Sequence, residues 1–121
     1  MNNHSTCPFC RQNNLLTAPV IAETDGAFLI EASKHPGNFL IIPAAHTETP
    51  AELPNDWWKS VATLLTQVPV TLDHYNISLN IGEHSGQTVN HLHFWVVPRQ
   101  ADAASSGKGL TTLVQNADAQ K

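Results

Sequence analysis

Two histidines, His91 and His93, stand two residues apart in a segment that alternates between apolar and polar residues. The apolar residues occupy the alternate positions, which predicts a half-buried strand over residues 91–97. On such a strand both imidazoles and Trp95 lie on one face. A neutral imidazole acts near neutral pH as a nucleophile, a base or a metal ligand. The spacing therefore predicts a chemically active face.

The segment before these histidines, residues 80–87, is rich in glycine, amide and hydroxyl groups. Backbone N–H groups in such a loop can bind an anion. An anion site that leads into a histidine strand indicates phosphate chemistry, which needs a nucleophile, donors on the phosphate oxygens and a proton for the leaving group. The candidate donors are Asn80, Gln87 and the N–H groups of residues 85–89.

Two cysteines, Cys7 and Cys10, have the spacing of half a tetrahedral zinc site. The next histidine, His35, is too distant in sequence for a local zinc finger, so the fold would have to assemble the other ligands. Two ordinary reduced cysteines are the alternative. A thioredoxin-like redox pair fits poorly, because no βαβ pattern surrounds the motif.

The elements that position these residues are short strands, hairpin turns and one main helix, which together predict an α+β domain with an antiparallel sheet. Asp25-Gly26 predicts a hairpin turn, and helically spaced apolar residues predict a helix over about 56–68 that Pro69 ends. The strands are predicted over residues 19–23, 28–31, 38–42, 75–80 and 91–97.

The ends of the chain differ from this central part. Residues 1–6 are polar and are expected to be a flexible N-terminus, and residues 7–99 form the predicted domain. Residues 100–121 are expected to be a turn-like C-terminal tail with a short apolar patch at Leu110, Leu113 and Val114.

The composition limits the class of function. The chain has 121 residues, which suits one domain with its own core. Its formal charge of −4 argues against a nucleic-acid partner, which requires a basic surface. No apolar run is long enough for a membrane span, and the N-terminus lacks a signal-peptide pattern, so we expect no membrane partner and a cytoplasmic location.

Several motifs occur together and in order over residues 7–99. They are Cys-Pro-Phe-Cys at 7–10, Pro-Gly-Asn-Phe-Leu-Ile-Ile-Pro-Ala-Ala-His at 36–46, Asn-Ile-Gly-Glu at 80–83, Gly-Gln-Thr-Val at 86–89, His-Leu-His at 91–93 and Pro-Arg at 98–99. With these motifs the chain resembles the histidine-triad (HIT) family. The resemblance implies a HIT-like fold with a five-stranded antiparallel sheet, one main helix and sheets joined across a homodimer.

The same resemblance implies binding of a purine nucleotide and cleavage at its α-phosphorus, as in nucleoside phosphoramidases and dinucleoside polyphosphate hydrolases. His93 is then the nucleophile that forms a nucleotidyl-histidine intermediate, and Gln87 lies near the scissile bond. Glu31 falls near the family's ribose-binding acid if one gap is allowed. The implied substrate-binding residues are Asn80, Ser85, Gly86, Thr88, Val89, Asn38, Glu31 and Trp95.

The zinc-containing relatives imply the missing metal ligands. By position these are His46 and His91, which with Cys7 and Cys10 make a closed and therefore structural zinc site. Such a site would leave His93 free for chemistry.

Two positions depart from the family pattern. Trp95 replaces the third histidine of the triad, and Asn38 replaces the histidine of the Pro-Gly-His motif. Loss of one preorganised donor costs roughly 100- to 1,000-fold in rate. A non-catalytic, zinc-stabilised nucleotide-binding or sensing module is therefore the alternative to an enzyme, and a zinc-dependent nucleic-acid adaptor is a third hypothesis that the negative charge disfavours.

Overall fold

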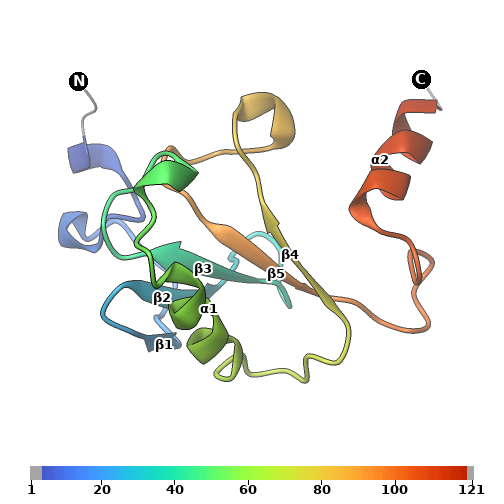
Figure 1. Ribbon diagram of the computed structural model, residues 1–121, viewed down its shortest axis with the longest axis horizontal. Coiled ribbons are helices and arrows are strands. Elements are labelled where there is room, and N and C mark those ends of the chain that lie inside the picture. The colour runs from blue at the N-terminus through green and yellow to red at the C-terminus, as the bar shows by residue number, and fades with distance from the viewer. Residues whose placement is uncertain (1–3, 120–121) are drawn as a thin grey trace.

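Five short strands form one antiparallel sheet in the order β1-β2-β3-β5-β4 (Figure 1). The computed structural model describes residues 4–119, so residues 1–3 of the expected flexible N-terminus lie outside the described residues. The fold class predicted from the sequence is confirmed. The strands are β1 (Ala22–Glu23), β2 (Ala27–Glu31), β3 (Phe39–Pro43), β4 (Tyr75–Leu79) and β5 (Phe94–Pro98).

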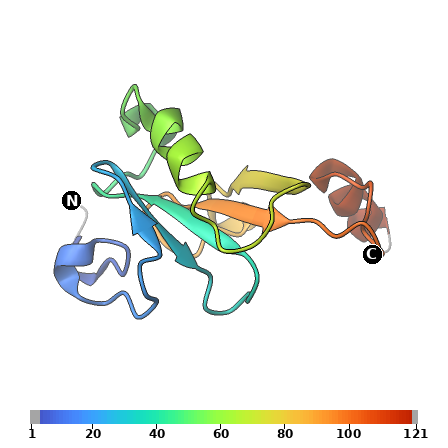
Figure 2. The same ribbon diagram turned by 90° about the horizontal axis from the view of Figure 1, so that it is seen from below.

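Helix α1 (Trp57–Leu65) covers one face of this sheet (Figure 2). Its buried residues recur at helical spacing and pack on the strand residues that face them, which gives the main hydrophobic core. The helix ends earlier than the predicted residue 68, because the N–H groups of Thr66 and Gln67 bond to carbonyls three residues back. The central residues of this core are Leu29, Phe39, Ile41, Trp57, Val61, Leu64, Phe94 and Val96.

The opposite face of the sheet carries a second apolar cluster, formed by alternate residues of β2 and β3. The N-terminal segment, with 3₁₀ turns at His4–Thr6 and Arg11–Asn13, lies on this side, away from α1 (Figure 2). Phe9 and Trp95 pack against the cluster. This second face therefore holds the residues that the sequence marks for chemistry.

The two histidines precede β5 and are not part of its ladder. The N–H of Leu92 donates to the carbonyl of Thr47 (2.7 Å), and pairing with β3 and β4 starts at Phe94. The strand predicted over 91–97 is therefore shorter than expected. Its alternation is retained, since Leu92, Phe94 and Val96 are all buried.

The C-terminal part differs from the turn-like prediction, because it contains helix α2 (Leu110–Ala119). The apolar patch at Leu110, Leu113 and Val114 has helical spacing, and α2 stands apart from the sheet in both views (Figures 1 and 2). The Arg99 guanidinium donates to the carbonyls of Ser105 and Lys108, at 2.7 and 2.6 Å, and so fixes the connection. No helix within the described residues is long and apolar enough to cross a membrane.

Candidate metal centre and adjoining pocket

Four side chains from three separate segments meet on the face opposite α1. The ligand atoms of Cys7, Cys10, His46 and His91 all lie within 4.8 Å of one another. The sulfur of Cys10 is 3.1 Å from Nδ1 of His46 and 3.6 Å from Nδ1 of His91, and the sulfur of Cys7 is 3.5 Å from the same His91 nitrogen. Tetrahedral zinc, with bonds of about 2.3 Å to sulfur and about 2.0 Å to nitrogen, places these atoms at such separations.

Each histidine of this cluster has its other ring nitrogen fixed by an acceptor. Nε2–H of His91 donates to the carbonyl of Pro43, and Nε2–H of His46 donates to the carboxylate of Glu48, both at 2.8 Å. Such partners orient metal-binding imidazoles and select the tautomer. In both residues the Nδ1 lone pair therefore points at the cysteine sulfurs.

A bound metal ion would change the protonation of the cysteines in this cluster. Burial, with the neighbouring Cys7 as a further cause, raises the pKa of the Cys10 thiol to about 11. Cys10 and His91 are 1% and 0% exposed, so water offers little compensation for thiolate charge. A divalent cation reverses this shift and holds both thiols as thiolates. The four residues fit a closed, structural zinc ion, as predicted.

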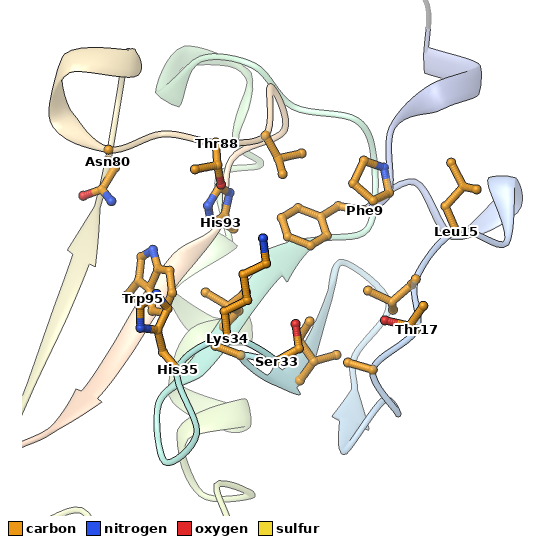
Figure 3. Close-up of a pocket in the computed structure, with 18 residues that line it drawn as sticks. Phe9, Leu15, Thr17, Ser33, Lys34, His35, Asn80, Thr88, His93 and Trp95 are labelled. Atoms are coloured by element: carbon orange, nitrogen blue, oxygen red, sulfur yellow. The ribbon is translucent and has the colours of Figure 1, made fainter.

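A pocket of about 560 Å³ adjoins this cluster (Figure 3). It has an apolar part and a polar part, and none of its lining residues carries a carboxylate. The apolar part contains Phe9, Leu15, Leu16, Ala18, Ile30 and Leu40. The polar part contains Ser33, Lys34, His35, Asn80, Thr88 and His93.

His93 connects the pocket to the metal cluster. Its side chain is 4% exposed, and its Nδ1–H donates to the carbonyl of His91 (2.9 Å). Burial lowers the pKa of His93, which keeps the ring neutral near neutral pH. With Nδ1 tied to the backbone, Nε2 is the nitrogen with a free lone pair. The Phe9 ring lies edge-on to both imidazoles, with centroids 5.1 Å from His93 and 6.0 Å from His91.

The loop before the histidines is held by its own side chains. Oε1 of Gln87 accepts the N–H of Gly82 (2.8 Å), and its Nε2 donates to the carbonyl of Val89 (2.9 Å). The hydroxyl of Ser85 donates to carbonyls of the preceding residues, and the N–H groups of residues 85–87 also bond within the loop. The expected anion donors 85–87 are thus engaged in shaping the loop.

Gly86 is required where this loop passes Asn80. Its φ is +102°, in the left-handed region, and a Cβ there would lie 3.3 Å from Nδ2 of Asn80. Both residues line the pocket. The glycine therefore lets the loop approach the asparagine amide closely.

The expected substrate residues divide into two groups. Asn80, Gly86, Thr88, Val89 and Trp95 line the pocket beside His93. The lining does not contain the other three, Glu31, Asn38 and Ser85, or Gln87, which was predicted near the scissile bond.

Glu31 ends β2, Asn38 follows the turn after it, and both have local partners. The Glu31 carboxylate accepts the N–H of Gly37 (2.9 Å), and Nδ2 of Asn38 donates to the carbonyl of His35 (3.2 Å). The same turn supplies Lys34 and His35, which the sequence analysis did not predict as site residues. A turn has no periodic pattern that would indicate which side chains face a cavity.

Trp95 occupies the pocket wall next to that turn. Its ring lies edge-on to the ring of His35, with centroids 5.5 Å apart. Its Nε1–H is buried and has no acceptor among the described residues. The tryptophan therefore closes the pocket beside His93 without contributing a bonded polar group.

Comparison with known proteins places this chain in a family. The HIT domain family matches residues 16–102, and the chain belongs to that family. An uncharacterised HIT-like protein of Methanocaldococcus jannaschii is 36% identical over 101 residues, which cover 77% of this chain and 78% of the relative. An adenosine 5′-monophosphoramidase of Schizosaccharomyces pombe is 28% identical over 109 residues, 86% of this chain and 82% of the relative.

Solved structures agree on the fold. The crystal structure of a zinc-bound histidine triad family protein from Mycobacterium smegmatis aligns with a TM-score of 0.64 at 23% identity. The alignment covers 97% of this chain and 99% of that protein. The HIT fold predicted from the sequence motifs is confirmed.

Proposed function

We propose that this protein is a hydrolase or transferase that cleaves a purine nucleoside phosphate derivative at the α-phosphorus, with His93 as the nucleophile. The observation that carries the proposal is the position of His93: a buried imidazole tied at Nδ1 to the His91 carbonyl, in the wall of a pocket that has no carboxylate. Nε2 then attacks phosphorus, and water hydrolyses the resulting nucleotidyl-histidine.

The two parts of the pocket match the two parts of such a substrate. Apolar side chains around Phe9 and Ile30 suit a nucleobase, whereas Asn80 and Thr88 suit the oxygens of the α-phosphate. The volume of about 560 Å³ lies in the range of small-molecule sites. The phosphoramidase activity named for the Schizosaccharomyces pombe relative supports the same assignment.

The metal has a structural role in this proposal. Cys7, Cys10, His46 and His91 hold zinc, in agreement with the zinc-bound relative from Mycobacterium smegmatis. Zinc stabilises the N-terminal segment, and its four protein ligands leave no open coordination position for substrate. All chemistry is therefore carried by His93 and the polar lining.

The test is the mass of the intact protein after mixing with adenosine phosphoramidate and, separately, with a diadenosine polyphosphate. Wild type should release AMP and pass through a nucleotidyl adduct. His93→Ala should form no adduct and lose at least about 1,000-fold in rate, as nucleophile variants do. Turnover that survives in His93→Ala would disprove the assignment.

A non-catalytic nucleotide-binding module is the second candidate. It is favoured by Trp95, which occupies the third histidine position and offers only a buried N–H. Tight nucleotide binding in wild type and His93→Ala, with no AMP from either, would support this candidate. Salt-sensitive binding to DNA or RNA would support the nucleic-acid adaptor instead.

The proposal includes a homodimer with one continuous sheet. Strand β4 forms an edge of the sheet, and its residues are half-buried or exposed in the single chain. An unpaired edge strand offers backbone donors and acceptors to a second copy. Light scattering after size-exclusion chromatography should give twice the 13.2 kDa chain mass, and a monomer at micromolar concentration would contradict it.

A further inference from the structure

We infer that Lys34 is a specificity-determining residue that selects substrates with an anionic leaving group, a phosphate or polyphosphate, over substrates with an amine leaving group. This inference rests on the proposed function. It concerns the turn between β2 and β3, which the motifs of the chain did not mark. Three independent features of the pocket carry it: the charge of the lining, the position of Lys34 and the absence of a proton donor at two key positions.

The charge of the pocket is opposite to that of the chain. The chain has a formal charge of −4, yet the pocket lining holds one lysine, two histidines and no carboxylate. Lys34 is the only lining residue with a permanent charge. A cation in a cavity lined by no carboxylate attracts phosphate oxygens, because no lining group competes with them for the charge.

Lys34 extends into the pocket along the side that leads to His93 (Figure 3). Its ammonium end points toward His93 and toward the loop that supplies Asn80 and Thr88, so a phosphate chain held by that loop would face the ammonium group. A second phosphate, beyond the one that His93 attacks, would meet this cation. An amine leaving group would gain nothing from it.

The proton balance points to the same class of substrate. When His93 Nε2 attacks, a bond forms from nitrogen to the α-phosphorus, the bond from phosphorus to the leaving atom breaks, and its electron pair stays on that atom. A phosphate or polyphosphate leaves as a stable oxyanion and needs no proton. An amine is a poor leaving group unless it is protonated first.

Two positions that could hold an acid to protonate an amine leaving group carry other side chains in this protein. Trp95 and Asn38 stand where the family pattern places histidines, and neither an indole nor an amide exchanges a proton near neutral pH. Asn38 also bonds to the backbone of His35 and does not line the pocket. In the second step water attacks the nucleotidyl-histidine, His93 is released neutral, and the proton of the water passes to solvent.

The remaining titratable group in the pocket is His35. Its ring lies edge-on to Trp95, with centroids 5.5 Å apart. An acid at this position could protonate an amine leaving group. His35 is therefore the residue that could contradict the inference. The experiment therefore includes it.

The experiment compares kcat/KM for a diadenosine polyphosphate and for adenosine phosphoramidate in wild type, Lys34→Ala and Lys34→Gln. Wild type should favour the polyphosphate. Both variants should lose about 10- to 100-fold on the polyphosphate, the effect of one charge-assisted hydrogen bond, and change less than about threefold on the phosphoramidate. Lys59→Ala, an exposed lysine on α1, is the matched control and should change neither.

Equal losses on both substrates, or no loss on the polyphosphate, would overturn the inference. So would fast phosphoramidate turnover that His35→Gln abolishes, because the pocket would then contain its own acid. If wild type releases no AMP from either substrate, the proposed function fails by itself. Selection by Lys34 is then tested by measuring binding affinities in the His93→Ala protein. There, adding Lys34→Ala should weaken the affinity for the polyphosphate about tenfold relative to the affinity for AMP. An unchanged ratio of the two affinities would overturn the inference.

Discussion

His91 and His93 are two residues apart and both buried, yet the backbone fixes a different ring nitrogen in each. In His91 the carbonyl of Pro43 accepts Nε2–H, so Nδ1 faces the two cysteines. In His93 the carbonyl of His91 accepts Nδ1–H, so Nε2 is the free nitrogen. The position of one backbone acceptor therefore decides which ring nitrogen is available, Nδ1 toward the cysteines in His91 and Nε2 in His93.

The two regions around these histidines differ in the same way. In the metal cluster each histidine ring donates its N–H to a protein acceptor, the carbonyl of Pro43 for His91 and the carboxylate of Glu48 for His46. In the pocket Lys34 is exposed, and the buried N–H of Trp95 has no acceptor within residues 4–119. We interpret the first region as built for stability and the second as kept open for a ligand. Three predictions test this division, and a fourth concerns a carboxylate outside both regions.

The largest effect is expected from the metal cluster. Cys10→Ser should abolish stoichiometric zinc binding, because it removes a buried thiolate ligand. The loss in free energy of unfolding should be about 4 kcal/mol or more when free zinc exceeds its dissociation constant about 1,000-fold. Metal analysis and urea unfolding, with and without a chelator, measure both. The exposed His84→Ala is the control, and a wild type without zinc would contradict the prediction.

The second prediction separates the two histidines. His91→Ala should cost about 3 kcal/mol or more, since it removes a buried metal ligand. His93→Ala should stay within about 1 kcal/mol of wild type, because its ring borders the pocket and pays a desolvation penalty in the folded state. Urea unfolding of both variants in the presence of zinc gives the two values. Similar losses in the free energy of unfolding for the two variants would contradict the proposed division.

The third prediction concerns Glu48, whose carboxylate accepts the Nε2–H of His46. Glu48→Gln should weaken zinc binding by about 10- to 100-fold, as observed for lost partners of metal-binding histidines, while nucleotide affinity at saturating zinc stays unchanged. Competition with a zinc indicator measures the first quantity and calorimetry the second. Glu83→Gln, on the exposed loop near His84, serves as a control. An unchanged zinc affinity would show that the carboxylate is dispensable.

The smallest effect is a pH dependence outside both regions. Hydrogen bonds from the N–H groups of Glu48 and Thr49 lower the pKa of Glu52. A carboxyl whose pKa is lower when folded stabilises the protein above its unfolded pKa, and this contribution disappears as the pH falls through the folded value. The stability difference between wild type and Glu52→Gln should therefore be constant near neutral pH and shrink below about pH 4. A pH-independent difference would contradict this origin.

The sequence predicted the fold where a periodic pattern exists. The alternation around the two histidines identified which side chains face the core, although the ladder itself begins at Phe94. The sequence did not predict helix α2, because the apolar residues of the tail are few and are not among the described residues that form the core on the sheet. Local spacing thus predicts burial better than it predicts the hydrogen-bonded ends of elements.

The site was predicted only where a motif carries it. The four metal ligands came from the order of motifs, and the structure brings them together. Lys34 and His35 were missed because a turn has no signal for which side chains face a cavity. Gln87 was placed near the reaction, whereas its amide bridges Gly82 and Val89 within the loop.

The segment between Cys7 and Cys10 affects how the pocket can open. Phe9 contacts both histidines and, with residues 15–18, forms one wall of the pocket. That wall is connected to the sheet through the metal ligands, through apolar packing of Phe9, Leu16 and Ala18 on the second cluster, and through Arg11, which pairs with Glu23 and lies over the Phe28 ring. A segment that packs outside the main core can separate as a local unit in hydrogen exchange. Loss of zinc should therefore loosen residues 7–18 before the sheet, and the pocket would then open along this wall.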